Sequence, residues 1–182
     1  MKNNGIENSV SYAVLQLRHA TMADLPAIHA LFVQAQAYMF REGNTEQWRC
    51  LPARSVLETD IAKNELYVYT QSVAGEEVLE GAFVLQQGSC PAYEKIEAGA
   101  WPTKGPYISL HRVVSSGRVK RLFDRICAYA FTMADEVRID THEKNISMRR
   151  ALQRNGFTYC GIIHLPDGGA RRAYIGFYKE IS

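Results

Sequence analysis

Residues 107–157 read YISLHRVVSSGRVKRLFDRICAYAFTMADEVRIDTHEKNISMRRALQRNGF, and this stretch decides the fold. It begins with an apolar strand (residues 107–114) and passes through a turn of small residues, Ser115-Ser116-Gly117, into the basic segment Arg118-Val119-Lys120-Arg121. A strand, a tight turn and the cationic start of a helix form an anion site, because backbone N–H groups, the helix dipole and cationic side chains meet there. The stretch therefore predicts a site for a small phosphorylated cofactor.

A long amphipathic helix is predicted over residues 119–134. Its apolar positions lie in two adjacent rows, which should pack as one wide face on a sheet: Leu122, Ile126, Ala130 and Met133, then Phe123, Cys127 and Ala134. Residues 137–141 are predicted to be a strand. A second helix, headed by Asn145, should end at Asn155-Gly156-Phe157.

The rest of the chain divides by periodicity and turn signals. Predicted strands cover residues 15–19, 66–72, 78–86, 158–164 and 171–179, with turns at Gly75 and at Pro166-Asp167-Gly168-Gly169. Two helices are expected, one opened by a capping box at Thr21-Met22-Ala23-Asp24 and one over residues 52–63. Residues 88–106 should form an irregular loop, long enough to suggest a functional role.

This order, β-α-α-β-β-β-α-β-α-β-β, predicts an α/β (α+β) fold with a mixed sheet and helices on both faces. The 182 residues suit one domain, which we place at residues 13–182, with residues 1–12 as a flexible leader. The net charge of +2 and the pI of about 8.3 are too mild to indicate nucleic-acid binding. The sequence contains no run of 18 apolar residues, so no membrane span is predicted. Residues 1–12 are polar and lack the apolar core of a signal peptide.

The four cysteines (Cys50, Cys90, Cys127 and Cys160) are scattered without a Cys-x-x-Cys pair. This spacing favours reduced thiols in a cytoplasmic protein, although a disulfide stays possible on sequence alone. No metal site is expected.

Several motifs, in this order, resemble the GNAT superfamily of N-acetyltransferases, and some of them resemble a single bacterial branch of it. They are Leu17 to Leu25, Gly43-Asn44 with Gln47-Trp48 and Pro52, Leu110 to Ser115, Ile139 to Asn145, and Asn155-Gly156-Phe157. Each motif alone is weak, but together they cover nearly the whole chain from Leu15. The resemblance implies a mostly antiparallel twisted sheet with a splay between the fourth and fifth strands.

The resemblance also implies acetyl-CoA as cosubstrate, lying in the splay. Its arm would bond to the backbone of Val113, Val114 and Ser115, its pyrophosphate would sit at Arg118, Val119, Lys120, Arg121, Leu122 and Phe123, and Asn145 would touch the arm. An amine would then attack the thioester directly, helped by a base, a backbone oxyanion site and an acid.

Four positions depart from the family pattern, the mildest being Met148, where the family often has a small residue. Arg121 and Phe123 stand where small residues usually let a phosphate approach the backbone, although the arginines and Lys120 add charge-assisted contacts. Leu152 stands where the family usually has a tyrosine acid, so that role is empty, or is filled by water or another residue such as Tyr159 or Tyr174.

The catalytic candidates are His111, Asp140 and His142. The unperturbed pKa of a histidine, near 6.5, suits a base. The alternative is that His111 is a packed, hydrogen-bonded strand residue and that Asp140 and His142 are structural partners or helix caps. Gln47, Trp48 and Arg112 are candidate acceptor contacts, against readings as core or salt-bridged residues. Asn145 also reads as a simple N-cap.

We expect an acyltransferase that moves an acetyl group to a primary amine of a small molecule or peptide, and the resemblance suggests a homodimer as its assembly. The alternative is a catalytically weak or inactive GNAT-fold module that binds a CoA ester or a protein partner. Nucleic-acid binding through the basic segment ranks below both.

Overall fold

The computed structural model describes residues 14–178, and its centre is one seven-stranded sheet in the order β1-β2-β3-β4-β5-β7-β6. The strands are β1 (Gln16–His19), β2 (Leu66–Val73), β3 (Glu76–Gln87), β4 (Ile108–Ser115), β5 (Glu136–Thr141), β6 (Thr158–His164) and β7 (Ala170–Phe177). β4 and β5 run parallel, and the other neighbouring strands are antiparallel. The predicted mixed, mostly antiparallel sheet is confirmed.

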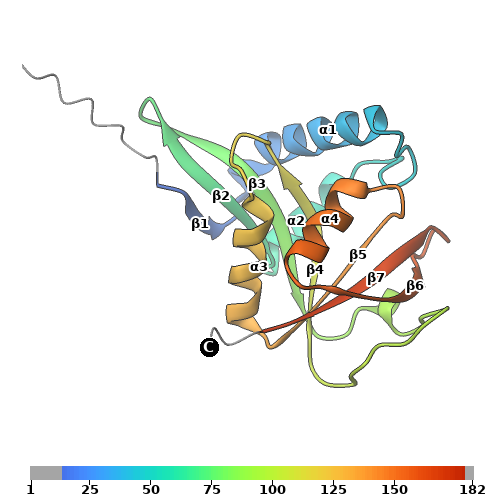
Figure 1. Cartoon of the computed structure of the whole chain (residues 1–182). Coiled ribbons are helices and arrows are strands. Elements are labelled where there is room, and N and C mark those ends of the chain that lie inside the picture. The colour runs from blue at the N-terminus through green and yellow to red at the C-terminus, as the bar shows by residue number, and fades with distance from the viewer. Residues whose placement is uncertain (1–13, 179–182) are drawn as a thin grey trace, which may run out of the picture.

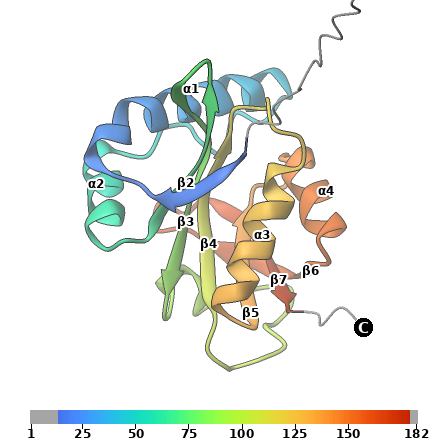
Figure 2. The same cartoon turned by 90° about the vertical axis from the view of Figure 1, so that its left-hand side faces the viewer.

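Two helices cover each face of the sheet (Figure 2). α1 (Leu25–Arg41) and α2 (Arg54–Ala62) pack on one face around Val68, Val84 and Val114. α3 (Leu122–Met133) and α4 (Ile146–Arg154) lie on the other, where Leu122 and Ile126 pack against strand residues. The predicted order of strands and helices is therefore confirmed element by element. The Asp24 carboxylate accepts the Thr21 N–H at 2.7 Å, so the predicted capping box forms and leads through a short 3-10 turn, η1 (Met22–Asp24), into α1.

α3 begins at Leu122, three residues later than predicted. Arg121 is in the left-handed region with φ of +58°, and a helix cannot continue backwards through such a residue. The basic segment is therefore a loop that precedes the helix. This difference changes where its side chains point, as described below.

β4 and β5 pair over only three residue pairs among the described residues, ending at Leu110 opposite Ile139. Beyond that point the two strands spread apart like the arms of a V (Figure 1). The pairing of β4 with β3 shifts register at the same level, where Arg112 has φ of +52°. This bulge bends β4 away from β5 and leaves part of its backbone without a strand partner, since an extra residue in a bulge is unpaired. The predicted splay between the fourth and fifth strands is thus confirmed.

The loop between β3 and β4 is irregular, as predicted, apart from a short 3-10 turn, η2 (Pro91–Tyr93). It docks on the edge strand β6 through a bridge between Glu97 and Ile162. A Cβ added at Gly99 would lie 1.9 Å from the Cys160 carbonyl oxygen, so only glycine fits this contact. The docking carries Tyr93 into the interior.

The predicted leader, residues 1–12, lies outside the described residues. Within residues 14–178, none of the helices has the length and apolarity needed to cross a bilayer. All four cysteines carry free thiols, with Cys50 exposed and the other three buried.

Candidate active site

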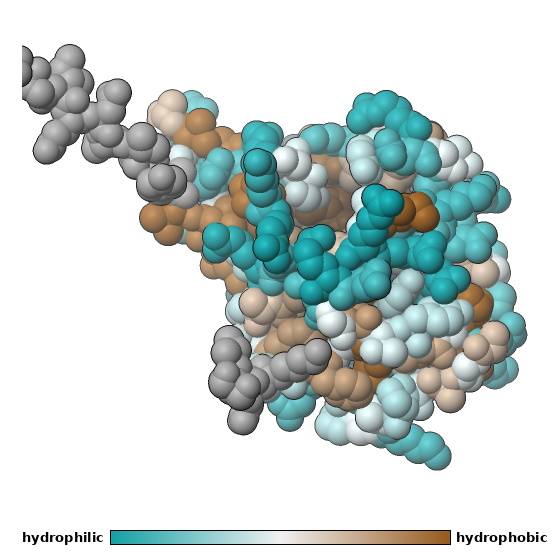
Figure 3. Space-filling model, in the orientation of Figure 1, coloured by the Kyte–Doolittle hydropathy of each residue, from teal (hydrophilic) through white to brown (hydrophobic). Residues whose placement is uncertain are grey.

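A cavity of about 680 Å³ opens in the splay between β4 and β5. Its walls come from the β4 bulge, the end of β5, the start of α4 and the segment that runs from α1 to α2. In the space-filling view this side of the molecule has a recess between α1 and the hydrophilic side chains of α3 and α4, with hydrophobic surface inside it (Figure 3). The cavity is therefore reachable from solvent and mixed in polarity.

The predicted cofactor contacts divide into two groups. Val113, Val114, Ser115, Phe123 and Asn145 line the cavity. Arg118, Val119, Lys120, Arg121 and Leu122 do not: Leu122 is buried in the core, and Val119 packs against it. The cavity lining adds Ser116 and Gly117, so it reaches the small-residue turn and stops short of the basic side chains.

Arg118 points toward β3. Its Nε donates to the Glu80 carboxylate at 3.1 Å, and its Nη2 donates to the Leu79 carbonyl at 2.9 Å. Glu80 is fully buried and also accepts from the Ser116 hydroxyl and, at 2.8 Å, from Gln71 Nε2. A buried carboxylate thus holds both ends of the turn, and the Arg118 side chain, which was predicted to bind phosphate, forms an ion pair with it.

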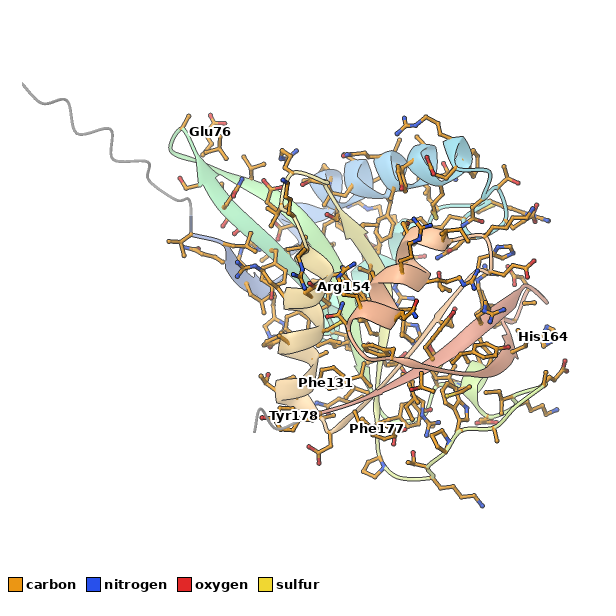
Figure 4. The ribbon with its side chains drawn as sticks, in the orientation of Figure 1. Glu76, Phe131, Arg154, His164, Phe177 and Tyr178 are labelled. Carbon is orange, nitrogen blue, oxygen red and sulfur yellow. The ribbon has the colours of Figure 1, made fainter. Side chains whose placement is uncertain are left out.

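Arg121 is held in a similar way. It pairs with Asp124, which also accepts from Arg154 at 2.9 Å and from Asn155 at 2.8 Å. These donors hold the pKa of Asp124 at about 2 against the opposing effect of burial. Figure 4 shows Arg154 where the end of α4 meets α3. The Asp124 carboxylate therefore ties the start of α3 to the end of α4. Lys120 is exposed, and among the described residues no ion pair engages it.

His111 and Asp140 meet in the cavity at the point where the strands part. His111 Nδ1 lies 3.9 Å from the Asp140 carboxylate, which accepts a hydrogen bond of 2.8 Å from the Tyr93 hydroxyl. Burial lowers the pKa of His111 below its ordinary value, and the Asp140 charge only partly opposes this. The imidazole is therefore neutral near pH 7 and can accept a proton from a group in the cavity.

Tyr93→Phe should destabilise the fold and raise the pKa of His111. The hydroxyl is fully buried, and its loss leaves the Asp140 carboxylate with one donor fewer, at a cost of about 1–3 kcal/mol. Asp140 would then interact more strongly with the protonated form of His111. Urea denaturation and NMR titration measure both effects, with Tyr159→Phe on the exposed surface as the control. An unchanged His111 titration would show that Tyr93 does not act on the pair.

His142 was predicted beside these residues, but it does not line the cavity. Its Nδ1 accepts the Lys144 N–H at 3.2 Å, within the turn that leads to α4. Burial and the nearby Arg171 charge lower its pKa. The structure therefore brings His111 and Asp140 together and places the His142 side chain in a turn. Across residues 14–178, no three His, Cys, Asp or Glu side chains are grouped so as to hold a metal ion.

Gln47 lines the cavity and organises its wall. Its Oε1 accepts from Asn145 Nδ2 at 2.9 Å, from Thr141 Oγ1 at 3.2 Å and from the His142 N–H at 3.3 Å. This one oxygen joins the segment after α1 to the end of β5 and the start of α4. Asn145 also caps α4 through the Met148 N–H at 3.1 Å, so its N-cap reading is confirmed.

Trp48 and Arg112 also line the cavity, and each has a structural partner. Trp48 packs edge-on against Phe32, with ring centroids 5.1 Å apart. Arg112 donates to the buried Asp60 carboxylate at 2.8 Å. Burial raises the pKa of Asp60, while the arginine opposes that rise. Arg112 is thus salt-bridged, as one of its two interpretations predicted, and it also lies in the cavity wall.

Three residues of this region were not predicted: Tyr93, Glu80 and Arg171. Tyr93 lies in the loop whose length alone suggested a function. Glu80 lies within the predicted strand over residues 78–86, and Arg171 is one of two adjacent arginines in a late strand. Their roles come from partners far away along the chain, which a single sequence does not reveal.

No family model and no curated protein matches the chain. Solved structures do match. An acetyltransferase of the GNAT family from Streptococcus agalactiae 2603 superposes with a TM-score of 0.79 at 25% identity, over 91% of this chain and 96% of that chain. A GNAT-family acetyltransferase from Listeria monocytogenes 4b F2365 gives 0.65 at 19% identity, over 90% and 95%. A Bacillus subtilis acetyltransferase in complex with CoA gives 0.55 at 13% identity, over 92% and 99%.

Proposed function

From the GNAT-superfamily fold of this chain, we propose that it is an acetyl-CoA-dependent N-acetyltransferase that moves an acetyl group to a primary amine. The observation that carries the proposal is the pairing of His111 with Asp140 inside a cavity at the splay of β4 and β5. A neutral base there lies beside the open backbone of a bulged strand. Both are needed for direct attack of an amine on a thioester.

The cofactor arm would lie along β4, where Val113, Val114 and Ser115 border the cavity. Its acetyl group would then point toward His111, and its pyrophosphate toward the turn at Ser116 and Gly117. Lys120 and the N–H groups at the start of α3 supply positive charge there. In this arrangement the cofactor contacts backbone groups more than it contacts the side chains of the basic segment.

His111 would take the proton from the acceptor's ammonium group, and Asp140 would stabilise the imidazolium that forms. The free amine then attacks the thioester carbonyl, and a backbone N–H of the β4 bulge stabilises the oxyanion. Collapse of the intermediate breaks the C–S bond and expels the thiolate, and loss of the second amine proton, to the thiolate or to water, gives the amide. Leu152, at the position of the usual tyrosine acid, is fully buried in the core and donates nothing. A thiolate leaves readily without an acid, since thiols have a pKa near 8.5.

A second candidate is a module that binds a CoA ester without turnover. It is favoured by Leu152, which stands in place of the usual tyrosine acid and is fully buried. Turnover of acetyl-CoA with a panel of primary amines separates the two functions.

Saturating acetyl-CoA should raise the melting temperature. A ligand at about 100 times its dissociation constant adds roughly 2.7 kcal/mol to stability. For a chain of this length, that corresponds to about 5–10 °C. Differential scanning fluorimetry with acetyl-CoA, CoA and desulfo-CoA measures the shift. If all three ligands leave the melting temperature unchanged, the cofactor site is absent and both candidate functions lose their basis.

A further inference from the structure

Arg171 is a buried arginine in the wall of the cavity. Only 6% of its surface is exposed, and it lines the cavity from β7. Its Nη1 donates to the Ala170 carbonyl at 3.0 Å and its Nη2 to the Gln47 carbonyl at 3.1 Å. Among residues 14–178, no carboxylate lies within 4.0 Å of its guanidinium group. Burying an unpaired charge is costly, so such a residue needs a reason to persist.

The neighbouring arginines show what the chain does elsewhere. Arg138 is equally buried, and it pairs with Glu136 at 2.7 Å while stacking on Tyr107. Arg112, in the same cavity, pairs with Asp60. Asp167 is the acidic residue of the cavity wall on the Arg171 side, and it accepts the Gly169 N–H at 2.9 Å. Asp167 Oδ1 and Arg171 Nη1 lie 3.0 and 3.1 Å from the same point, the position a Cβ would take at Gly169, but they form no ion pair within 4.0 Å. Among the described residues, Arg171 therefore differs from Arg138 and Arg112 in that its hydrogen bonds go to neutral carbonyls.

The position of Arg171 relative to Asp140, the partner of the proposed base His111, follows from strand register. Asp140 lies opposite Ala173, and Arg171 is two residues further along β7, on the same face. Such diagonal neighbours are about 7–8 Å apart. The guanidinium has five N–H donors, and its two bonds to carbonyls leave three for a ligand. A small molecule could thus place its amine at His111 and an anionic group at Arg171.

We propose that the acceptor is an amine that also carries a carboxylate, as an amino acid does, and that Arg171 binds this carboxylate. The proposal rests on the acetyl transfer proposed above and names its substrate class. A charge-assisted bond from a guanidinium to a carboxylate is stronger than a neutral one and directional, so Arg171 would select acidic acceptors over their neutral analogues.

The test compares matched acceptors with acetyl-CoA: the L-α-amino acids, their carboxamides and the corresponding amines that lack the carboxyl group. We expect kcat/KM to favour the carboxylates by about 10- to 100-fold, the usual range for a hydrogen bond to a charged group. Arg171→Gln should remove most of that preference and leave the carboxamides within about 3-fold. Arg171→Lys, which keeps the charge, should retain some of it.

Arg172→Gln is the matched control, since Arg172 is the next residue and stacks on Tyr159 at 4.1 Å outside the cavity. The Arg172→Gln variant should keep the preference for carboxylate acceptors over their carboxamides. Wild-type protein that acetylates carboxamides as well as acids overturns the proposal, and so does an Arg171→Gln variant that loses both equally while remaining folded by circular dichroism. If Arg171→Gln does not fold, the wild-type preference and Arg171→Lys decide.

A binding experiment distinguishes failure of the carboxylate site from failure of the proposed acetyl transfer. Isothermal titration of the same amino acids and carboxamides into CoA-loaded protein measures binding without turnover. Carboxylate binding that Arg171→Gln abolishes supports the anion site even in a protein that transfers nothing. Equal binding of acids and amides, or none of either, overturns it.

Discussion

His111→Gln should lower kcat/KM for acetyl transfer by about 100-fold or more, within the range of 10²–10⁴ typical of a lost general base. The imidazole lies in the cavity 3.9 Å from Asp140, and burial lowers its pKa, so the wild-type base is neutral at pH 7. The acid limb of the activity profile should therefore lie below the ordinary histidine range, where the imidazole takes up a proton. The variant should lose this acid limb while its affinity for acetyl-CoA changes little. Steady-state kinetics between pH 5 and 8, with calorimetric cofactor binding, measures both.

The control for His111→Gln is His164→Gln, because His164 is exposed on β6 and contacts Glu97 away from the cavity. His142→Gln distinguishes the two predicted catalytic histidines. A loss in His142→Gln equal to that expected of His111→Gln, with His111→Gln active, would move the base to the turn before α4.

Glu80→Ala should cost about 1–3 kcal/mol of stability, the usual result of leaving buried hydrogen-bond donors without their acceptor, because Glu80 is buried while Arg118 is half exposed. The substitution leaves the Arg118 guanidinium without its carboxylate, and it removes the acceptor of the Ser116 hydroxyl and of Gln71. For this chain length, each kcal/mol corresponds to about 2–4 °C in melting temperature. Because Ser116 and Arg118 border the proposed pyrophosphate turn, acetyl-CoA should also bind more weakly. Thermal unfolding and cofactor titration test the two effects together.

Glu77→Ala is the matched control on the same strand. Glu77 is half exposed and pairs with Arg18 at the surface, where ion pairs contribute little. Its removal should hardly move the melting temperature or the cofactor affinity. A Glu80→Ala protein as stable as Glu77→Ala would show that the buried pair does not hold the turn.

The sequence predicted the architecture well, because local signals define its elements. Alternating apolar residues, the Gly75 turn and the cap at Asn145 each act within a few residues, and the order of all strands and helices followed from them. The exception is the start of α3, where Arg121 adopts a left-handed conformation that a basic, helix-favouring segment does not indicate.

The site was predicted less completely. His111, Asp140, Gln47, Trp48 and Asn145 all line the cavity, since strand ends and helix starts converge there. The basic segment was harder to interpret, because Arg118 is captured by a carboxylate 38 residues earlier in the chain. Tyr93 and Arg171 likewise depend on loop docking and strand register. Which cation is paired and which is free is a property of the assembled sheet.

The early separation of β4 from β5 also bears on how fast this sequence can change. A ligand held by main-chain groups along the bulge needs the path of the strand and tolerates many side chains along it. Mutation can therefore replace the residues around the splay while selection preserves its shape. A superposition with a TM-score of 0.79 at 25% identity, in a chain that no family model matches, is what this expectation predicts. For proteins of this kind, the path of the backbone preserves evidence of ancestry longer than the residues along it do.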